Sequence, residues 1–190
     1  YYTAIFELHS EGKNGIWNFL ILNSYRPALV EHSFNGLVSN PPWLTLSRIA
    51  DNPYNEHLKN LANEFNIRPS GSSFLHTELA TIFLLSSVER YLNDDAVIGC
   101  ILPGTLLSGD HHHPFRTMEY RDSDIHFNVS KIWDLDKSIF NNRGIAVFGT
   151  KSDSPNLNPI PSKRIHSSSQ TEDINLFLST LDSKSAWTPF

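Results

Sequence analysis

Three consecutive segments between residues 34 and 102 restrict the fold more than any other feature of the sequence. The apolar run at residues 34–39 stops at Asn-Pro-Pro, and because Asn-Pro and Pro-Pro break regular structure, a strand should end at about Ser39. Residues 74–92 carry apolar side chains over a wide arc of a helix, with Gly71–Ser73 available to cap its start. Residues 96–102 are continuously apolar, which is typical of a strand buried on both faces of a parallel sheet.

This order of strand, loop, helix and strand predicts a crossover unit whose two strands are parallel and joined right-handedly. Ligands of such α/β sheets bind beyond the carboxyl ends of the strands. We therefore expect the loop that begins at Asn40 and the loop that begins at Pro103 to lie at the same edge of the sheet.

The rest of the chain predicts further elements of one α/β domain, followed by a linker and a tail. Strands are expected at residues 1–9, 127–135 and 144–150, and helices within 16–30 and at 57–65. The helix at 57–65 is either an ordinary surface helix or a lid over a substrate. Residues 152–170 are rich in Ser, Pro and Asn without apolar periodicity. The predicted division is a domain at 1–151, a linker at 152–172 and a short tail segment at 173–190.

Composition and charge exclude several classes of protein. With 15 basic against 20 acidic residues and a net charge of -5, the chain would need other parts to supply most contacts to a nucleic-acid backbone. Cys100 is the only cysteine, which excludes a disulfide framework and suits a reducing cytoplasm. The sequence shows no signal peptide and no apolar run of membrane length, so we expect a cytoplasmic protein without a membrane partner.

The loop Asn40-Pro41-Pro42-Trp43 resembles the Asn-Pro-Pro-aromatic motif of the amino-group DNA methyltransferases, above all those that act on adenine N6. The resemblance implies that the Asn40 amide oxygen and the Pro41 carbonyl accept hydrogen bonds from the target amine and draw its lone pair out of conjugation. Pro42 would stiffen the loop, and Trp43 would stack on a base swung out of the duplex. Taken alone, the same four residues are also typical of a proline-stiffened turn with a buried Trp.

The resemblance covers about residues 3–151 and is strongest to the Eco57I-like group of adenine-specific restriction-modification methyltransferases. It implies an α/β fold that comprises the later strands of a Rossmann-like, S-adenosylmethionine-dependent methyltransferase sheet, with an irregular C-terminal tail. The implied reaction is direct methyl transfer to adenine N6 in double-stranded DNA, with cytosine N4 as an alternative target. Beyond the loop, the resemblance rests on residues 15–19, 25–27, 44, 75–92, 101–103, 106–109, 132–135 and 146–149.

Two departures from the family pattern limit what this chain can do alone. Asn35 stands where the family often has an acidic residue. The glycine-rich loop and the acidic residue that hold S-adenosylmethionine are both missing, so the resemblance places the cofactor half of the site before Tyr1, in a larger parent. We therefore assign no cofactor-binding residue here and expect the fragment to be inactive alone. The second hypothesis is a non-catalytic remnant, or a specificity or assembly module with a methyltransferase-like fold.

The Asp-His-His-His run that begins at Asp110 is the other candidate site. Neighbouring side chains of an extended segment point in alternate directions, so His111 and His113 could share a metal ion, with Asp110 or His126 as a further ligand. The simpler interpretation is a polar loop in which Arg116 could contact a substrate phosphate, and we predict no metal site. Ser-His-Asp hydrolysis is not expected, because the chain has no Gly-x-Ser-x-Gly elbow.

Overall fold

The computed structural model describes five ranges of the chain and seven single positions. The described residues are 29–69, 76–136, 142–154, 159–166 and 171–177, with residues 7, 10, 12, 71, 139, 188 and 189. The strand predicted at 1–9 and the helix predicted within 16–30 lie almost wholly outside them. Glu7, the one described residue of that first stretch, is helical and not extended.

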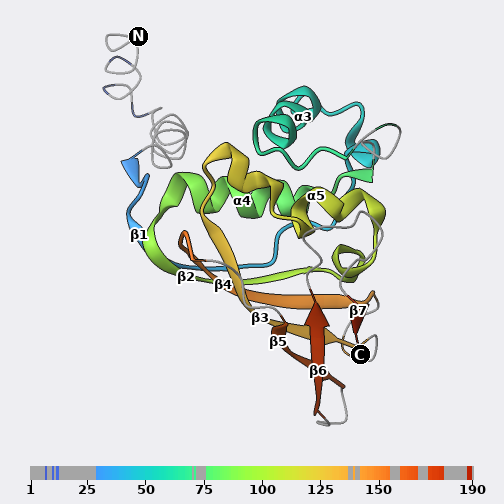
Figure 1. Ribbon diagram of the computed structural model, residues 1–190. Coiled ribbons are helices and arrows are strands. Elements are labelled where there is room, and N and C mark those ends of the chain that lie inside the picture. Colours follow the sequence, from blue (N-terminus) through green and yellow to red (C-terminus); the bar gives the residue numbers. More distant parts are fainter. Residues whose placement is uncertain are drawn as a thin grey trace.

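The described part of the chain forms a mixed 7-stranded sheet in the order β1-β2-β4-β3-β5-β6-β7, shown in Figure 1. β1 and β2 are parallel, whereas β4 is antiparallel to both of its neighbours, β2 and β3. The β3–β4 pair confirms the two strands predicted at 127–135 and 144–150. The strands are β1 (Phe34–Ser39), β2 (Leu92–Pro103), β3 (Phe127–Leu135), β4 (Gly144–Lys151), β5 (Ile160–Ile165), β6 (Thr171–Phe177) and β7 (Thr188–Pro189).

Helix α4 (Leu79–Tyr91) connects β1 to β2 and confirms the predicted crossover unit. Ser72 and Ser73, the predicted caps, lie outside the described residues. The helix begins later than the sequence indicates, with Glu78 before its first turn. The reason is tertiary: Thr45 and Glu78 form an isolated β-bridge, and the Leu79 backbone N–H donates to the Leu44 carbonyl. Glu78 is therefore held in an extended conformation at the position that precedes the first helical turn.

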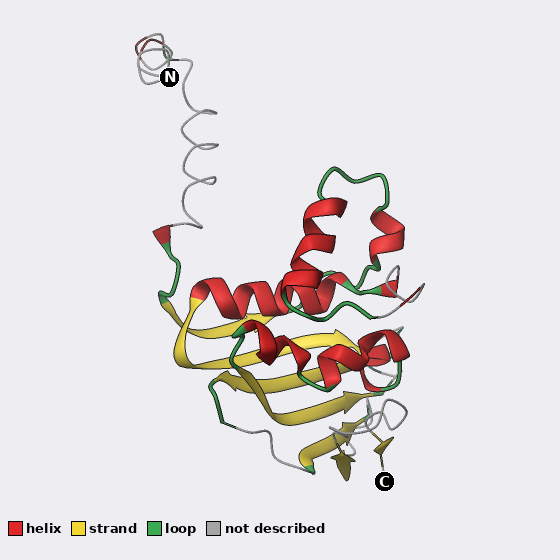
Figure 2. Ribbon diagram, turned by 45° about the horizontal axis from the view of Figure 1, so that its top comes forward, coloured by secondary structure: helices red, strands yellow, loops and turns green. Residues whose placement is uncertain are grey.

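The helices lie on one side of the sheet, as Figures 1 and 2 show for α3 (Asn55–Glu64), α4 and α5 (His113–Arg116). The hydrophobic core lies between them and the sheet. It includes Leu85 and Val88 of α4, Leu102 of β2 and Val147 of β4, all fully buried. Short 3-10 helices complete this layer: η1 (Leu46–Ile49), η3 (Gly104–Leu107), η4 (Asp110–His112) and η5 (Glu119–Ser123).

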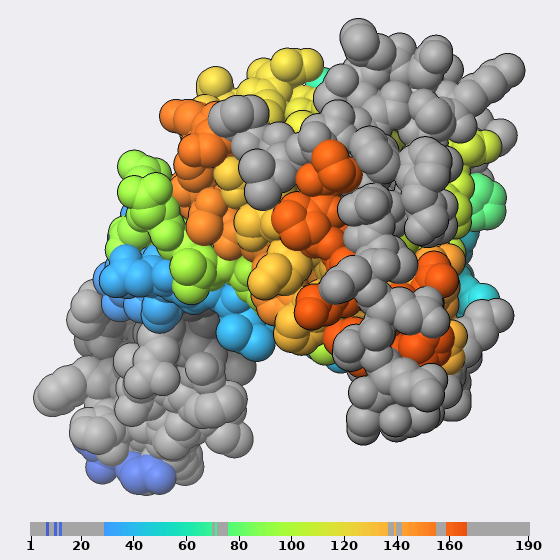
Figure 3. All heavy atoms as spheres, turned by 60° about the horizontal axis from the view of Figure 1, so that its bottom comes forward, coloured from blue at the N-terminus to red at the C-terminus, as the bar shows by residue number. Residues whose placement is uncertain are grey.

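The opposite face of β1 and β2 is open in the described part of the chain. Val38 of β1 is 95% exposed and Val97 of β2 is 62% exposed, and Figure 3 shows atoms of both strands, blue and green, at the surface of this face. The prediction that residues 96–102 are buried on both faces is therefore wrong. The strand alternates between core and surface because none of the described helices packs on this side.

The segment interpreted as a linker contains regular structure. β5 pairs in parallel with β3, and β6 pairs antiparallel with β5, so residues 160–165 and 171–177 extend the sheet. The expected lack of structure across 152–170 is wrong at β5, and the prolines and serines that suggested it do not prevent pairing there. The domain boundaries at 151 and 172 stay a prediction. Most of the predicted tail segment, 178–187 and 190, lies outside the described residues.

No helix in the described part of the chain is both long enough and apolar enough to cross a membrane.

Candidate functional site

The loop Asn40–Trp43 begins where β1 ends, at the carboxyl edge of the parallel β1–β2 pair. Ser39 is paired in register with Cys100 of β2, and the Trp43 indole N–H donates to the Ile101 carbonyl over 3.4 Å. The loops that follow β1 and β2 therefore lie at the same edge of the sheet, as predicted.

The four motif residues line one pocket of about 340 Å³. Asn40 is exposed and Pro41 is buried, and the Asn40 side chain makes no hydrogen bond to another described residue. Its amide oxygen is therefore available to a ligand. This arrangement differs from that of a turn that uses its own amide to close on the backbone.

Trp43 is half-buried, and the structure anchors one edge of its indole. A Cβ added at Gly144 would lie 2.8 Å from the Trp43 Cη2 atom, so the ring packs closely against the backbone at the start of β4. Trp43 thus contacts the core on one side while it lines the pocket on the other. The ring is therefore neither fully packed inward nor fully exposed, and its role as a stacking residue stays a prediction.

A larger apolar groove of about 440 Å³ adjoins the loop through Pro42 and Leu44. Its other walls come from η1, the turn before α3, and the helices α3 and α4, with Leu58 and Phe83 among the helical side chains. Helix α3 corresponds to the helix predicted at 57–65. Asn55, in its first turn, donates to the Leu46 carbonyl over 3.1 Å and to the Ile49 carbonyl, which ties α3 to η1.

The three consecutive histidines, residues 111–113, lie in η4 and at the start of α5, after β2. The side chains that come together there are not the ones expected from the sequence. The structure brings His111 and His112 close to Glu78, whereas the sequence indicated His111 and His113. His126 forms an ion pair with Asp153 elsewhere on the surface. Glu78 was missed because the helical pattern placed it inside a helix, and no local signal marks it as part of a site.

Arg116 does not face a substrate. It is buried, and its guanidinium donates to the Leu106 carbonyl over 3.0 Å and to the Gly109 carbonyl over 2.6 Å. The predicted contact with a phosphate is therefore wrong, because Arg116 is used to close the loop that follows β2. Burial lowers the pKa of His111 to about 4, with a further contribution from His112, so the His111 ring is neutral at neutral pH.

Comparison with solved structures identifies the fold of this chain. A protein of Listeria monocytogenes that has been proposed to be a class I S-adenosylmethionine-dependent methyltransferase is similar with a TM-score of 0.51 and 14% identity, over 72% of this chain and 38% of that protein. This chain has part of the S-adenosylmethionine-dependent methyltransferase fold. The partial Rossmann-like α/β fold expected from the sequence is thereby confirmed.

Two further solved structures contain a part that is similar to this chain. The type IIG restriction endonuclease BpuSI matches with a TM-score of 0.50 and 18% identity, over 73% of this chain and 15% of BpuSI. The DrdV–DNA complex matches with a TM-score of 0.52 and 15% identity, over 77% of this chain and 16% of that chain. No protein-family model and no curated protein matches the sequence. The chain thus spans a small part of much longer proteins, and the similarity shows the fold alone.

Proposed function

We propose that this chain is the amine-binding part of a DNA methyltransferase that modifies adenine N6 of a base flipped out of double-stranded DNA. The observation that carries the proposal is the pocket lined by Asn40, Pro41, Pro42 and Trp43 at the carboxyl edge of β1. The exposed Asn40 amide and the partly anchored Trp43 ring meet there, in a chain with part of a methyltransferase fold.

The loop residues act on the substrate amine in three ways. The Asn40 amide oxygen and the Pro41 carbonyl each accept a hydrogen bond from one N–H group of the amine. These hydrogen bonds favour a tetrahedral nitrogen with a localised lone pair. Trp43 stacks on the base, which compensates for part of the unstacking cost. Pro42 limits the conformations of the loop and so keeps the acceptors in place. S-adenosylmethionine supplies the methyl group to such an amine without a covalent enzyme intermediate.

The cofactor half of the site is proposed to come from the parent protein. The described residues include no glycine-rich turn after a strand, and β1 has no strand on its outer side within the described sheet. Val38 and Phe34 are exposed along that strand. We propose that a parallel strand of the preceding part pairs with β1 and that its helices cover the open face, which would place bound S-adenosylmethionine beside the Asn40 loop. Cytoplasmic localisation stays a prediction.

The decisive experiment is Asn40→Ala in the full-length parent, assayed for transfer of labelled methyl groups to DNA. We expect methyl transfer to fall by two or more orders of magnitude while the circular dichroism spectrum stays unchanged. Asn35→Ala is the matched control, because Asn35 is an exposed amide in β1, the strand that precedes the loop, and its side chain accepts a hydrogen bond from Asn93. Activity retained by Asn40→Ala would exclude the proposed role. Mass analysis of the methylated base separates adenine N6 from cytosine N4.

A non-catalytic specificity or assembly module is the second candidate, and the net charge of -5 favours it for this chain taken alone. The two functions differ in whether a base enters the pocket. Full-length protein mixed with duplex DNA carrying 2-aminopurine at the target should raise the fluorescence of that base if it is flipped out. A module without that activity would bind the duplex with unchanged fluorescence.

A further inference from the structure

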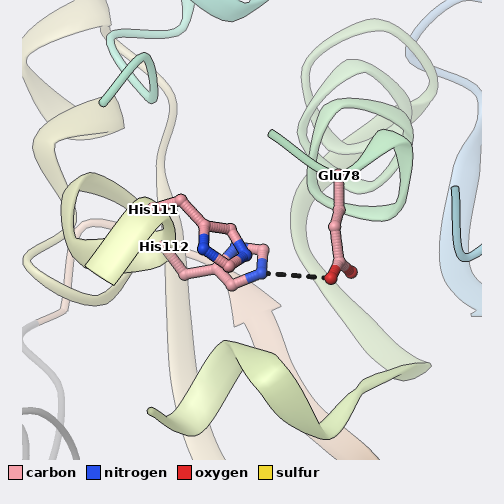
Figure 4. A group of neighbouring side chains, drawn as sticks. All are labelled: Glu78, His111 and His112. Atoms are coloured by element: carbon pink, nitrogen blue, oxygen red, sulfur yellow. Dashed lines mark ion pairs between the residues drawn. The ribbon is translucent and has the colours of Figure 1, made fainter. Parts of the chain in front are cut away.

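Glu78, His111 and His112 form a compact cluster behind the motif loop, as Figure 4 shows. The ligand atoms of the three side chains all lie within 4.8 Å of one another. His112 Nε2 is 3.4 Å from Glu78 Oε1, and the His111 and His112 ring centroids are 4.2 Å apart. The cluster joins the residue that precedes α4 to the 3-10 helix η4 that follows β2.

Two polar atoms of this cluster are buried without a hydrogen-bond partner among the described residues: Glu78 Oε2 and His112 Nε2. Glu78 is 7% exposed and His112 is 2% exposed. The other carboxylate oxygen, Glu78 Oε1, accepts a hydrogen bond from the Thr105 hydroxyl over 2.7 Å. Because buried polar groups are normally satisfied, these two unpartnered atoms indicate that the cluster binds another species.

We propose that Glu78, His111 and His112 bind one divalent transition-metal ion of the Zn²⁺ class. Zinc bonds to imidazole nitrogen and carboxylate oxygen are about 2.0–2.2 Å long, which puts tetrahedral ligands roughly 3.3 Å apart. The distance of 3.4 Å between His112 Nε2 and Glu78 Oε1, the oxygen that also accepts from Thr105, is close to this spacing. The His111 ligand atom lies within 4.8 Å of the other two, so the half-buried His111 ring has to move closer when an ion binds.

The donor set decides the class of ion. Two imidazoles and one carboxylate suit zinc and its neighbours in the periodic table, whereas Mg²⁺ and Ca²⁺ prefer six or more oxygen ligands. The fourth position is left to water. Arg116 adds a positive charge near the cluster, but Asp110 and the Glu78 carboxylate offset it. The proposal departs from the expectation of no metal site, and its two histidines, His111 and His112, differ from the pair that the sequence indicated.

The expected role of the ion is to position the motif loop. Glu78 forms the β-bridge with Thr45, two residues after Trp43, and the histidines belong to the loop that follows β2. An ion bound by all three side chains would fasten the two loops of the carboxyl edge to each other. This inference does not depend on the proposed methyl transfer.

The test uses the full chain without a histidine tag, stripped with a chelator and titrated with Co²⁺ as a spectroscopic substitute for zinc. We expect one equivalent of Co²⁺ to bind and to give the intense visible absorption of a four- or five-coordinate site. Zn²⁺ should displace the Co²⁺ and raise the melting temperature of the chain, whereas Mg²⁺ should do neither. Weak absorption without a stoichiometric end point in the folded wild-type chain would overturn the proposal.

Variants assign the ligands. Glu78→Gln and His111→Ala should each lower Co²⁺ affinity at least tenfold. Both substitutions should disturb folding less than a change at the buried His112. His57→Ala is the matched control, because His57 lines the apolar groove and is not one of the three residues of the cluster. Circular dichroism establishes that each variant is folded. Unchanged Co²⁺ binding by both ligand variants, or equal loss in His57→Ala, would show that the ion binds elsewhere.

Discussion

Asp134 shows how a single buried charge is held in this sheet. Arg143 donates to both carboxylate oxygens, over 2.9 and 2.8 Å, and Arg164 of β5 donates over 3.1 Å. Burial alone would raise the pKa of Asp134, but the hydrogen bonds and charges of the two guanidinium groups outweigh it and hold the pKa below its ordinary value. The carboxylate thereby joins β3 to β5, in the segment that the sequence predicted to be a linker.

The lowered pKa of Asp134 predicts how stability depends on pH. A carboxyl whose pKa is lower in the folded state contributes stability above its unfolded pKa of about 3.9 and loses it as the pH falls through the folded pKa. Asp134→Asn should cost about 2 kcal/mol near neutral pH, since the arginines that lose their partner are partly exposed. Urea unfolding of both proteins should show this difference shrinking in acid.

Asp153→Asn is the matched control for Asp134, because Asp153 pairs with His126 at the surface. A difference between wild type and Asp134→Asn that stayed constant down to acid pH would contradict a role for the Asp134 charge. An equal loss in Asp153→Asn would show that the measurement reports surface charge in general.

Cys100 gives a second prediction at the residue scale. It is 2% exposed, and burial raises its thiol pKa to about 12, so almost none of it is the reactive thiolate at neutral pH. Iodoacetamide should leave Cys100 unmodified in the folded chain and alkylate it in urea, as mass spectrometry can follow. Rapid alkylation of the folded chain would mean that β2 opens readily or lies at the surface.

At the scale of elements, the contact between the motif loop and β4 matters most. A Cβ at Gly144 would lie 2.8 Å from the indole of Trp43, so Gly144→Ala must displace the ring or the strand. We expect a shifted Trp43 resonance in 19F NMR of 5-fluorotryptophan-labelled chain, assigned with Trp43→Phe. In the full-length parent, methyl transfer should fall by up to about 100-fold, because a displacement of about 1 Å can have that effect.

Gly99→Ala provides the control for Gly144→Ala. Gly99 lies in the neighbouring strand β2, but a Cβ there would meet Phe148 at 3.8 Å, an ordinary contact. The Trp43 resonance should therefore stay in place. An unmoved resonance in Gly144→Ala as well would show that the loop and β4 are packed less closely than the structure indicates.

The elements also show where reasoning from local sequence ends. The periodicity of residues 74–92 predicted α4 correctly apart from its start, because the residues that form one face of a helix are close in the chain. The predicted start of the helix was wrong, because the bridge between Thr45 and Glu78 holds Glu78 outside the helix and joins segments distant in sequence. Strand β5 was missed for a related reason: its pairing partner β3 lies far earlier in the chain.

At the scale of the whole molecule, no described strand pairs with the outer side of β1, and no described helix covers the face of β1 and β2 that carries Val38 and Val97. The proposed site has amine acceptors but no described group suited to the cofactor. We therefore expect the isolated chain to bind S-adenosylmethionine weakly or not at all in a calorimetric titration. A full-length parent that carries the preceding part should bind it. A micromolar dissociation constant for the isolated chain would contradict the proposed division of the site.

The sequence by itself determined the crossover unit and the display of Asn40, Pro41, Pro42 and Trp43 after β1. Strand breakers and apolar periodicity act between near neighbours, and parallel pairing then places the two loops at one edge. Only the tertiary structure decided that Glu78 meets His111 and His112, that Gly144 supports Trp43, and that β5 joins the sheet. Each of these contacts unites segments remote in the chain, and the backbone conformation that permits them carries no local signature.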